Sequence, residues 1–169
     1  MFRMQADSFF RGCRHSDHHN KSNPAFKVTP YAFFTNEKVL SDNGTFDTSI
    51  YWHDDDHALS FFYNNDKKNS SGENTKHGIT EIDFPSACQN IIDADFQNIV
   101  SLNHYPDPSD PDNTYHGNIS FVSNFREILD EKFPGMPKKE KLRQFCNCFA
   151  YAEKNFYTPH DLQNMFPEK

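Results

Sequence analysis

The chain has 169 residues and a formal net charge of −7, a length that fits one domain spanning 1–169. No run of about 20 apolar residues occurs, which excludes a membrane-spanning helix, and the acidic balance argues against a general nucleic-acid binder. Eighteen phenylalanines equal the leucines, isoleucines and valines combined, so aromatic side chains must supply much of the core.

The expected elements of the N-terminal half are a helix over 4–12, strand fragments at 32–34 and 39–41, a strand over 46–52, a helix over 57–63 and a polar loop over 64–77. Asn43-Gly44 favours a tight hairpin turn between extended segments, because both residues tolerate a positive φ. Asp54, Asp55 and Asp56 provide capping oxygens and favourable charge at the start of the helix that follows.

The expected elements of the C-terminal half are a strand over 78–84, a helix over 85–92, strands over 99–102 and 118–122, helices over 124–133 and 137–156, and a terminal turn ending near Met165. Ser123 and Thr158-Pro159 supply cap signals for two of these helices. Short strands followed by the longest helices predict an α+β fold. We expect a small, largely antiparallel sheet with long loops, packed by helices between about 123 and 166.

Charge is distributed unevenly along the chain. Residues 1–30 carry a net +3, residues 41–115 a net −11, and residues 116–169 a net +1. The acidic middle is typical of a solvated face, and it would also suit a basic partner protein or a cation. Four cysteines without a CxxC pair are too few for a disulfide scaffold of this length, so we expect free thiols and a cytoplasmic location.

Two histidine-containing segments are candidate metal sites. His53 and His57 would share one face of a continuous helix, the spacing used for two zinc ligands. The strand-to-helix junction expected between them makes capping by the aspartates the simpler explanation. In the N-terminal segment 11–19, Cys13, His15, His18 and His19 could hold a metal, but their spacing matches no metal module. Arg11 and Arg14 could bind a phosphate or carboxylate, and a mobile polar loop is the simpler explanation of the segment. We therefore expect no cofactor, with a divalent metal at His53 and His57 as the alternative.

His104 and His116 flank a proline-rich loop and lie at predicted strand ends. Loops beside strand ends commonly hold catalytic groups, and histidine suits proton transfer near neutral pH. The alternative is that these histidines hydrogen-bond the loop backbone and fix its shape. A Gly-rich phosphate loop, a GxSxG motif and a DxDxDG calcium loop are all missing from the sequence.

The order of several short motifs resembles a loose family of small bacterial proteins for which no activity is implied. The matching segments are Phe10-Arg11, 23–26 (NPAF), 49–52 (SIYW), Pro106-Asp107-Pro108 and 116–119 (HGNI). The resemblance covers about residues 10–121 and favours a bacterial or phage origin. Tyr115-His116-Gly117 is also similar to a strand of ADP-ribosyltransferases, but only 52 residues follow it here, and we treat that match as coincidence.

Two functions follow from these observations as hypotheses. The first is a cytoplasmic binding or accessory protein that contacts another protein, as a component of a bacterial toxin–antitoxin or phage-defence system. The alternative is a hydrolase or transferase acting on a nucleotide or nucleic acid, with catalytic groups Arg11, Arg14, His104 and His116. The enzyme hypothesis predicts that these four side chains converge in one cleft, whereas the binding hypothesis predicts that they scatter.

Overall fold

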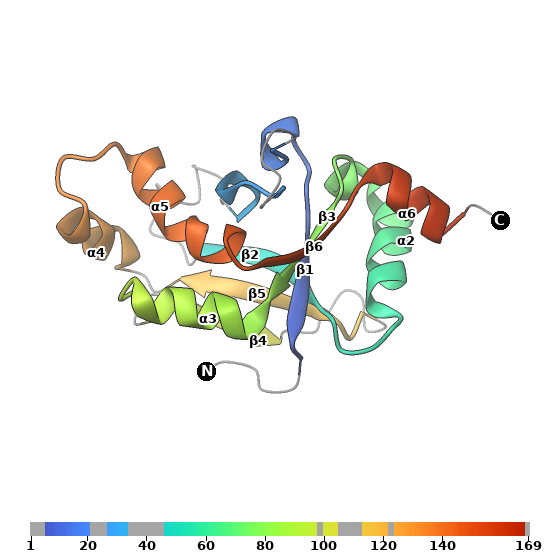
Figure 1. The fold of residues 1–169 in the computed structure, drawn as a ribbon, viewed down its shortest axis with the longest axis horizontal. Helices are drawn as coiled ribbons and strands as arrows, with labels where there is room; N and C mark the ends of the chain where they lie inside the picture. Colours follow the sequence, from blue (N-terminus) through green and yellow to red (C-terminus); the bar gives the residue numbers. More distant parts are fainter. Residues whose placement is uncertain are drawn as a thin grey trace.

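The structure is a computed structural model that describes residues 6–20, 27–33, 46–97, 100–104, 113–121 and 124–167. These residues form an α+β fold around a six-stranded antiparallel sheet with strand order β4-β5-β2-β1-β3-β6 (Figure 1). The strands are β1 (Ser8–Gly12), β2 (Phe46–Trp52), β3 (Ile79–Asp83), β4 (Val100–His104), β5 (His116–Phe121) and β6 (Glu153–Tyr157).

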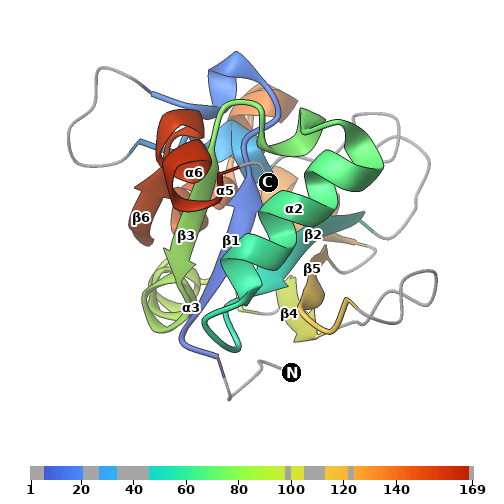
Figure 2. The ribbon, with the colours of Figure 1, turned by 90° about the vertical axis from the view of Figure 1, so that its right-hand side faces the viewer.

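Helices cover both faces of the sheet. The α-helices are α2 (Ala58–Ser70), α3 (Phe84–Asp93), α4 (Phe125–Lys132), α5 (Lys138–Ala150) and α6 (Pro159–Met165), and three short 3₁₀ helices are η1 (Ser16–His18), η2 (Pro30–Phe33) and η3 (Glu73–Thr75). Figure 2 shows α2 and α6 in front of β1 and β3, whereas α3 and α5 lie on the opposite side. No helix in the described ranges is long and apolar enough to cross a membrane.

Two hydrophobic cores result from the alternation of side chains along the strands. Phe9 and Trp52 point into the core under α3 and α5, whereas Phe10 points into the core under α2 and α6. Among the described residues, seven of the ten largest fully buried side chains are aromatic, as the composition predicts. The rings of Phe9 and Trp52 meet edge to face with centroids 5.6 Å apart, a favoured aromatic geometry.

The prediction of a helix over 4–12 is wrong, because 8–12 form β1 at the centre of the sheet. Phe9 and Phe10 are both fully buried, on opposite faces, and only a strand places consecutive residues in this way. The polar loop predicted over 64–77 is also wrong, since α2 continues to Ser70. Asp66 extends the buried stripe of α2 although it is charged, so hydrophobic periodicity did not reveal this part of the helix.

Two further segments differ from expectation. The strand fragment at 32–34 is part of η2 over 30–33, with Ala32 and Phe33 buried against α5. The helix predicted over 137–156 ends at Ala150, and 153–157 form β6 on the edge of the sheet beside β3. The strand at 39–41, the Asn43-Gly44 turn and Ser123 lie outside the described residues.

Several secondary-structure predictions that rest on local sequence signals are confirmed. The strand predicted over 46–52 coincides with β2, and the strand and helix predicted over 78–92 correspond to β3 and α3. Thr158 begins α6 through reciprocal bonds: its Oγ1 accepts from Asp161 N at 3.1 Å, and Asp161 Oδ2 accepts from Thr158 N at 2.9 Å.

Candidate functional site

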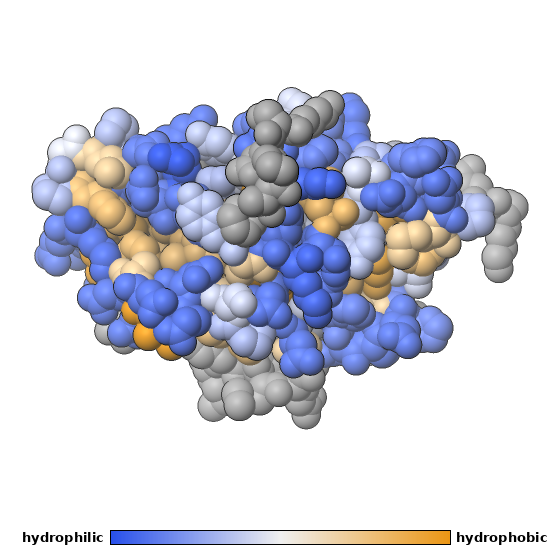
Figure 3. Space-filling model, in the orientation of Figure 1, coloured by the Kyte–Doolittle hydropathy of each residue, from blue (hydrophilic) through white to orange (hydrophobic). Residues whose placement is uncertain are grey.

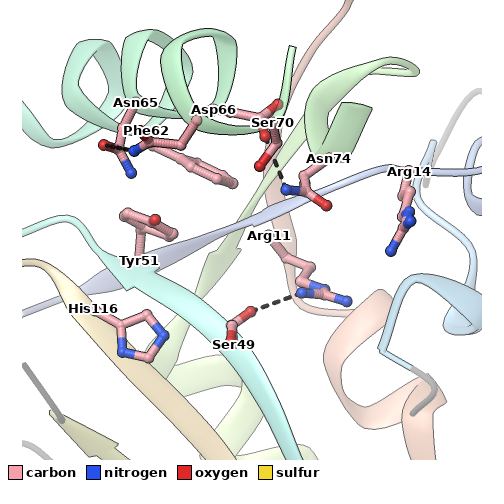
Figure 4. Close-up of a pocket in the computed structure, with 12 residues that line it drawn as sticks. Arg11, Arg14, Ser49, Tyr51, Phe62, Asn65, Asp66, Ser70, Asn74 and His116 are labelled. Carbon is pink, nitrogen blue, oxygen red and sulfur yellow. Dashed lines mark hydrogen bonds between the residues drawn. The ribbon is translucent and has the colours of Figure 1, made fainter. Parts of the chain in front are cut away.

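A cavity of about 360 Å³ lies between the sheet and α2, and three of the four catalytic candidates line it (Figure 4). Arg11 comes from β1, Arg14 from the loop after β1, and His116 from the first position of β5. The fourth candidate, His104, ends β4, where its backbone pairs with Gly117, and its side chain lies outside the described part of the structure.

Arg11 occupies a gap between β1 and β2. These strands pair at Phe9 with Trp52 and at Phe10 with Tyr51, and the pairing ends there. Beyond that point the Arg11 guanidinium bridges the strands, with Nη1 donating to the Ser49 carbonyl at 2.9 Å and Nε donating to the Ala32 carbonyl at 2.8 Å. The open end of the β1–β2 pair therefore becomes one wall of the cavity.

The Arg11 charge has no acidic partner within the described ranges. The side chain is half-buried, and burial lowers its pKa, yet an arginine remains protonated at physiological pH. Two of its N–H groups are satisfied by backbone carbonyls, and the guanidinium has further donors beside the cavity. A half-buried cation held in this way offers a binding site for an anion.

Arg14 lies on a short loop that His18 holds in place. His18 Nδ1 accepts from the backbone N–H groups of Arg14 at 3.2 Å and of His15 at 3.4 Å. Burial lowers the pKa of His18 to about 4, so the ring is neutral at pH 7 and can accept both bonds. The Arg14 guanidinium is exposed and lies 3.8 Å from Glu73, an exposed ion pair of little strength, which leaves it available at the cavity mouth.

The wall opposite the sheet is built by α2 and η3. Buried Asp66 accepts hydrogen bonds from Asn74 Nδ2 at 2.9 Å and from Thr75 N at 2.9 Å, which ties η3 to α2. Gly12 allows β1 to approach this unit, because a Cβ at this position would lie 2.3 Å from the Asn74 carbonyl oxygen. Asn65 and Asn69 add amide groups along the same wall.

Tyr51 lies on the cavity floor beside His116. Its ring stacks on Phe62 at 4.1 Å between centroids and meets the His116 ring edge to face at 6.0 Å. Its hydroxyl accepts from Nδ2 of Asn113 at 3.2 Å, and Asn113 is buried with an Oδ1 atom that has no partner in the described structure. The cavity thus combines two cations, a histidine suited to proton transfer and an oriented phenol.

His53 and His57 belong to a different region and do not converge. His53 Nδ1 lies 2.9 Å from Oε2 of Glu81, whose other partners include Ser8 and Asn155, whereas His57 is exposed at the N-cap of α2. Burial alone raises the pKa of Glu81, but the hydrogen bonds from Ser8, Asn155 and His53 outweigh it and lower the pKa. In the parts of the chain that are described, no three His, Cys, Asp or Glu side chains gather to hold a metal ion.

Sequence reasoning missed Tyr51, Gly12 and the residues of α2 that complete the cavity. Alternation along the predicted strand at 46–52 places Ser49 and Tyr51 on one face, and this was the available signal. The contribution of α2 has no hydrophobic signal in the sequence, because the C-terminal half of this helix is polar and its buried position is Asp66. Comparison with models of known protein families, with curated proteins and with solved structures finds no match to this chain.

Proposed function

We propose that the protein is an enzyme, a hydrolase or transferase, that binds a nucleotide in the cavity between the sheet and α2. The observation that carries this proposal is the half-buried Arg11 guanidinium, which has no acidic partner in the described ranges and lines the same cavity as Arg14 and His116. A phosphate group would neutralise both arginines, and planar guanidinium groups match the geometry of phosphate oxygens.

The opposite wall suits the rest of a nucleotide. Asn69 Nδ2 donates to Asn65 Oδ1 at 2.8 Å, and this pair places Asn65 Nδ2 and Asn69 Oδ1, groups of the kind that bond a base edge or a ribose hydroxyl, on the same wall. A volume of about 360 Å³ lies in the lower part of the range for small-molecule sites. The limited volume favours a free nucleotide over a nucleic acid, in agreement with the net charge of −7.

His116 would transfer a proton during the reaction. It lies at the edge of the cavity against Tyr51, opposite the two arginines, so a bound phosphate would place the reacting bond between these groups. The hypothesis of a pure binding protein predicts scattered arginines and histidines, and the convergence of Arg11, Arg14 and His116 supports the enzyme instead. A nucleotide enzyme of this size also suits the expected bacterial toxin–antitoxin or phage-defence setting.

The test is calorimetric titration with nucleoside mono-, di- and triphosphates and dinucleotides, with the matching nucleosides as controls. We expect a phosphorylated compound to bind and its nucleoside to bind at least about tenfold more weakly. Arg14→Ala should weaken binding by a similar factor. Arg11→Lys keeps the charge but loses the planar fork, so it should also weaken binding.

Lys154→Ala serves as the matched control, because Lys154 is an exposed cation on the edge strand β6 and is not part of the cavity. The control variant should bind as the wild type does. Equal binding of nucleosides and nucleotides, or equal weakening in the control and in Arg14→Ala, would refute the proposal. For any compound that binds, incubation followed by chromatography then identifies hydrolysis or transfer.

A further inference from the structure

The cavity between the sheet and α2 has one acidic side chain in its described lining, and the fold already uses it. Asp66 is buried, and its carboxylate accepts from Asn74 Nδ2 at 2.9 Å, from Thr75 N at 2.9 Å and from Thr75 Oγ1 at 2.8 Å. A carboxylate held in this way is not available as a metal ligand or as a base. His116 is therefore the described lining residue best suited to accept a proton from a substrate.

The cations of the cavity can stabilise a phosphate whose negative charge increases during a reaction. Arg11 uses Nε and one N–H of Nη1 on two backbone carbonyls, so Nη2 and the second N–H of Nη1 have no partner among the described residues. Arg14 stands at the cavity mouth, where its exposed ion pair with Glu73 is weak. Attack on a phosphodiester adds charge to the non-bridging oxygens, and guanidinium donors that are already in place stabilise that charge.

The accessible polar groups of the cavity favour a hydroxylated ligand. Ser49 is exposed, its hydroxyl has no partner among the described residues, and it lies between Arg11 and His116 in the view of Figure 4. In Figure 3 an apolar area lies at the end of the molecule that carries α4 and α5, away from α2. The cavity is accordingly suited to a charged ligand with hydroxyl groups, such as a ribonucleotide, rather than to an apolar one.

This set of groups can transfer a phosphoryl group when the substrate supplies its own nucleophile. A water molecule would have to be both activated and positioned, and the described lining offers no free carboxylate or metal site for that task. A ribose 2′-hydroxyl is held next to a 3′-phosphate by covalent bonds, and intramolecular reactions of this kind reach high effective molarities. One proton acceptor and two cations are the groups that such a reaction requires.

We propose, on the basis of the proposed function, that the substrate is a ribonucleotide whose 3′-phosphate is esterified to a further nucleoside, as in a 3′–5′ dinucleotide. His116 takes the proton of the 2′-hydroxyl, the bond from the 2′-oxygen to phosphorus forms, and the bond from phosphorus to the 5′-oxygen breaks. Arg11 and Arg14 bind the phosphate during this transfer. The 5′-oxygen takes a proton from solvent and His116 returns its proton to solvent, so no co-reactant is consumed. The products are a 2′,3′-cyclic phosphate and a nucleoside with a free 5′-hydroxyl.

The test compares 3′–5′ dinucleotides with analogues that lack the 2′-hydroxyl beside the scissile phosphate, with wild-type protein in buffer that contains EDTA. The deoxy analogues keep the phosphate, so they should bind within about threefold of the ribonucleotides in calorimetry. They should be cleaved at least about a hundredfold more slowly, because the internal nucleophile is missing. Mass spectrometry of the ribonucleotide products should find the 2′,3′-cyclic phosphate.

Three variants purified in parallel exclude a contaminating nuclease. His116→Ala and Arg11→Lys should each slow cleavage at least about a hundredfold, whereas Lys154→Ala, which changes an exposed cation outside the cavity, should cleave as the wild type does. Equal cleavage in all proteins, equal cleavage of the ribo and deoxy series, loss of cleavage in EDTA, or a product with a 5′-phosphate would overturn the proposal.

The experiment also separates this inference from the proposed function. A ribodinucleotide that binds without being cleaved, or turnover of a different nucleotide only, would overturn the inference while a nucleotide site at Arg11 and Arg14 still stands. If no nucleotide of any class binds in calorimetry, the proposed function itself fails, and the inference fails with it.

Discussion

At the scale of single residues, two ionisable groups of the sheet, Glu81 and Arg11, differ in how many polar side chains contact them. Glu81 is 2 % exposed, and its carboxylate meets Ser8 Oγ, His53 Nδ1 and Asn155 Nδ2 within 2.9 Å. These contacts bring together side chains of β1, β3 and β6 and the residue after β2, so Glu81 has a structural role that the protein completes by itself. Among the described residues, Arg11 is held by two backbone carbonyls and faces no carboxylate.

His116→Ala tests the proton-transfer role at the same scale. General acid–base groups contribute about 10²–10⁴-fold to a rate, so the variant should lose turnover of the bound nucleotide by such a factor. Its unfolding free energy should fall by less than about 1–2 kcal/mol, the range for an ordinary hydrogen bond. Thermal melting and turnover are measured on one preparation, with exposed His57→Ala as the control. A His116 variant that melts much earlier but retains activity in its folded fraction would assign the residue a structural role.

At the scale of elements, the sequence predicted those strands and helices that show a clear hydrophobic alternation or a clear capping signal. Alternation predicted β2, and the Thr158-Pro159 cap predicted the start of α6. The central strand β1 could not be predicted, because its adjacent phenylalanines are buried on two faces and show no alternation. The end of α5 was also hidden, since Phe156 continues the apolar spacing of the helix although it belongs to β6.

The candidate site was predictable only in part, because its residues come together through long-range contacts that no local sequence period reveals. Arg11, Arg14 and His116 stood out by residue type, and their convergence depends on pairings between strands that are distant in sequence. The contribution of α2 rests on buried Asp66, whose partners Asn74 and Thr75 follow the helix. A carboxylate at a core position contradicts hydrophobic patterning, so sequence reasoning placed this wall in a loop.

Gly12→Ala tests how closely β1 approaches η3. The new methyl group would collide with the Asn74 carbonyl, so we expect a loss of about 1–3 kcal/mol in unfolding free energy and weaker nucleotide binding. Gly135→Ala is the comparison: its Cβ meets nothing within 4 Å, but its φ of +77° disfavours alanine by about 1 kcal/mol. Urea denaturation and calorimetry measure both effects. Unchanged ligand affinity in Gly12→Ala would show that η3 does not shape the cavity.

The η1 loop should make stability depend on pH through His18. Burial lowers the pKa of His18 from 6.5 to about 4, so the unfolded chain takes up a proton before the folded protein does. The unfolding free energy should therefore fall as the pH drops from about 6.5 to about 4, by roughly 3 kcal/mol from this residue. Urea denaturation across that range measures the slope, and His18→Gln should reduce it. An identical slope in both proteins would contradict the role assigned to His18.

At the scale of the whole molecule, the two faces of the sheet differ: one carries the larger hydrophobic core, and the other carries the candidate site. The core under α3 and α5 contains the larger cluster of buried side chains, whereas the core under α2 and α6 is smaller and borders the cavity. The α2 side therefore combines less apolar burial with the polar wall of the site. Hydrogen exchange should accordingly find α2 less protected than α5 if local stability follows buried apolar contacts.

The cysteines report on the larger core, because Cys13, Cys146 and Cys148 are buried in it and Cys88 packs against it. All four are free thiols, and burial raises the pKa of Cys13 to about 12 and those of Cys88 and Cys148 to about 11. Since the thiolate is the reactive form, iodoacetamide at about pH 8 should label the native protein slowly and the urea-unfolded protein completely. Reductant should leave the melting temperature unchanged. Rapid native labelling of several thiols, or a melting temperature that drops on reduction, would show that this core opens readily or that a disulfide supports it.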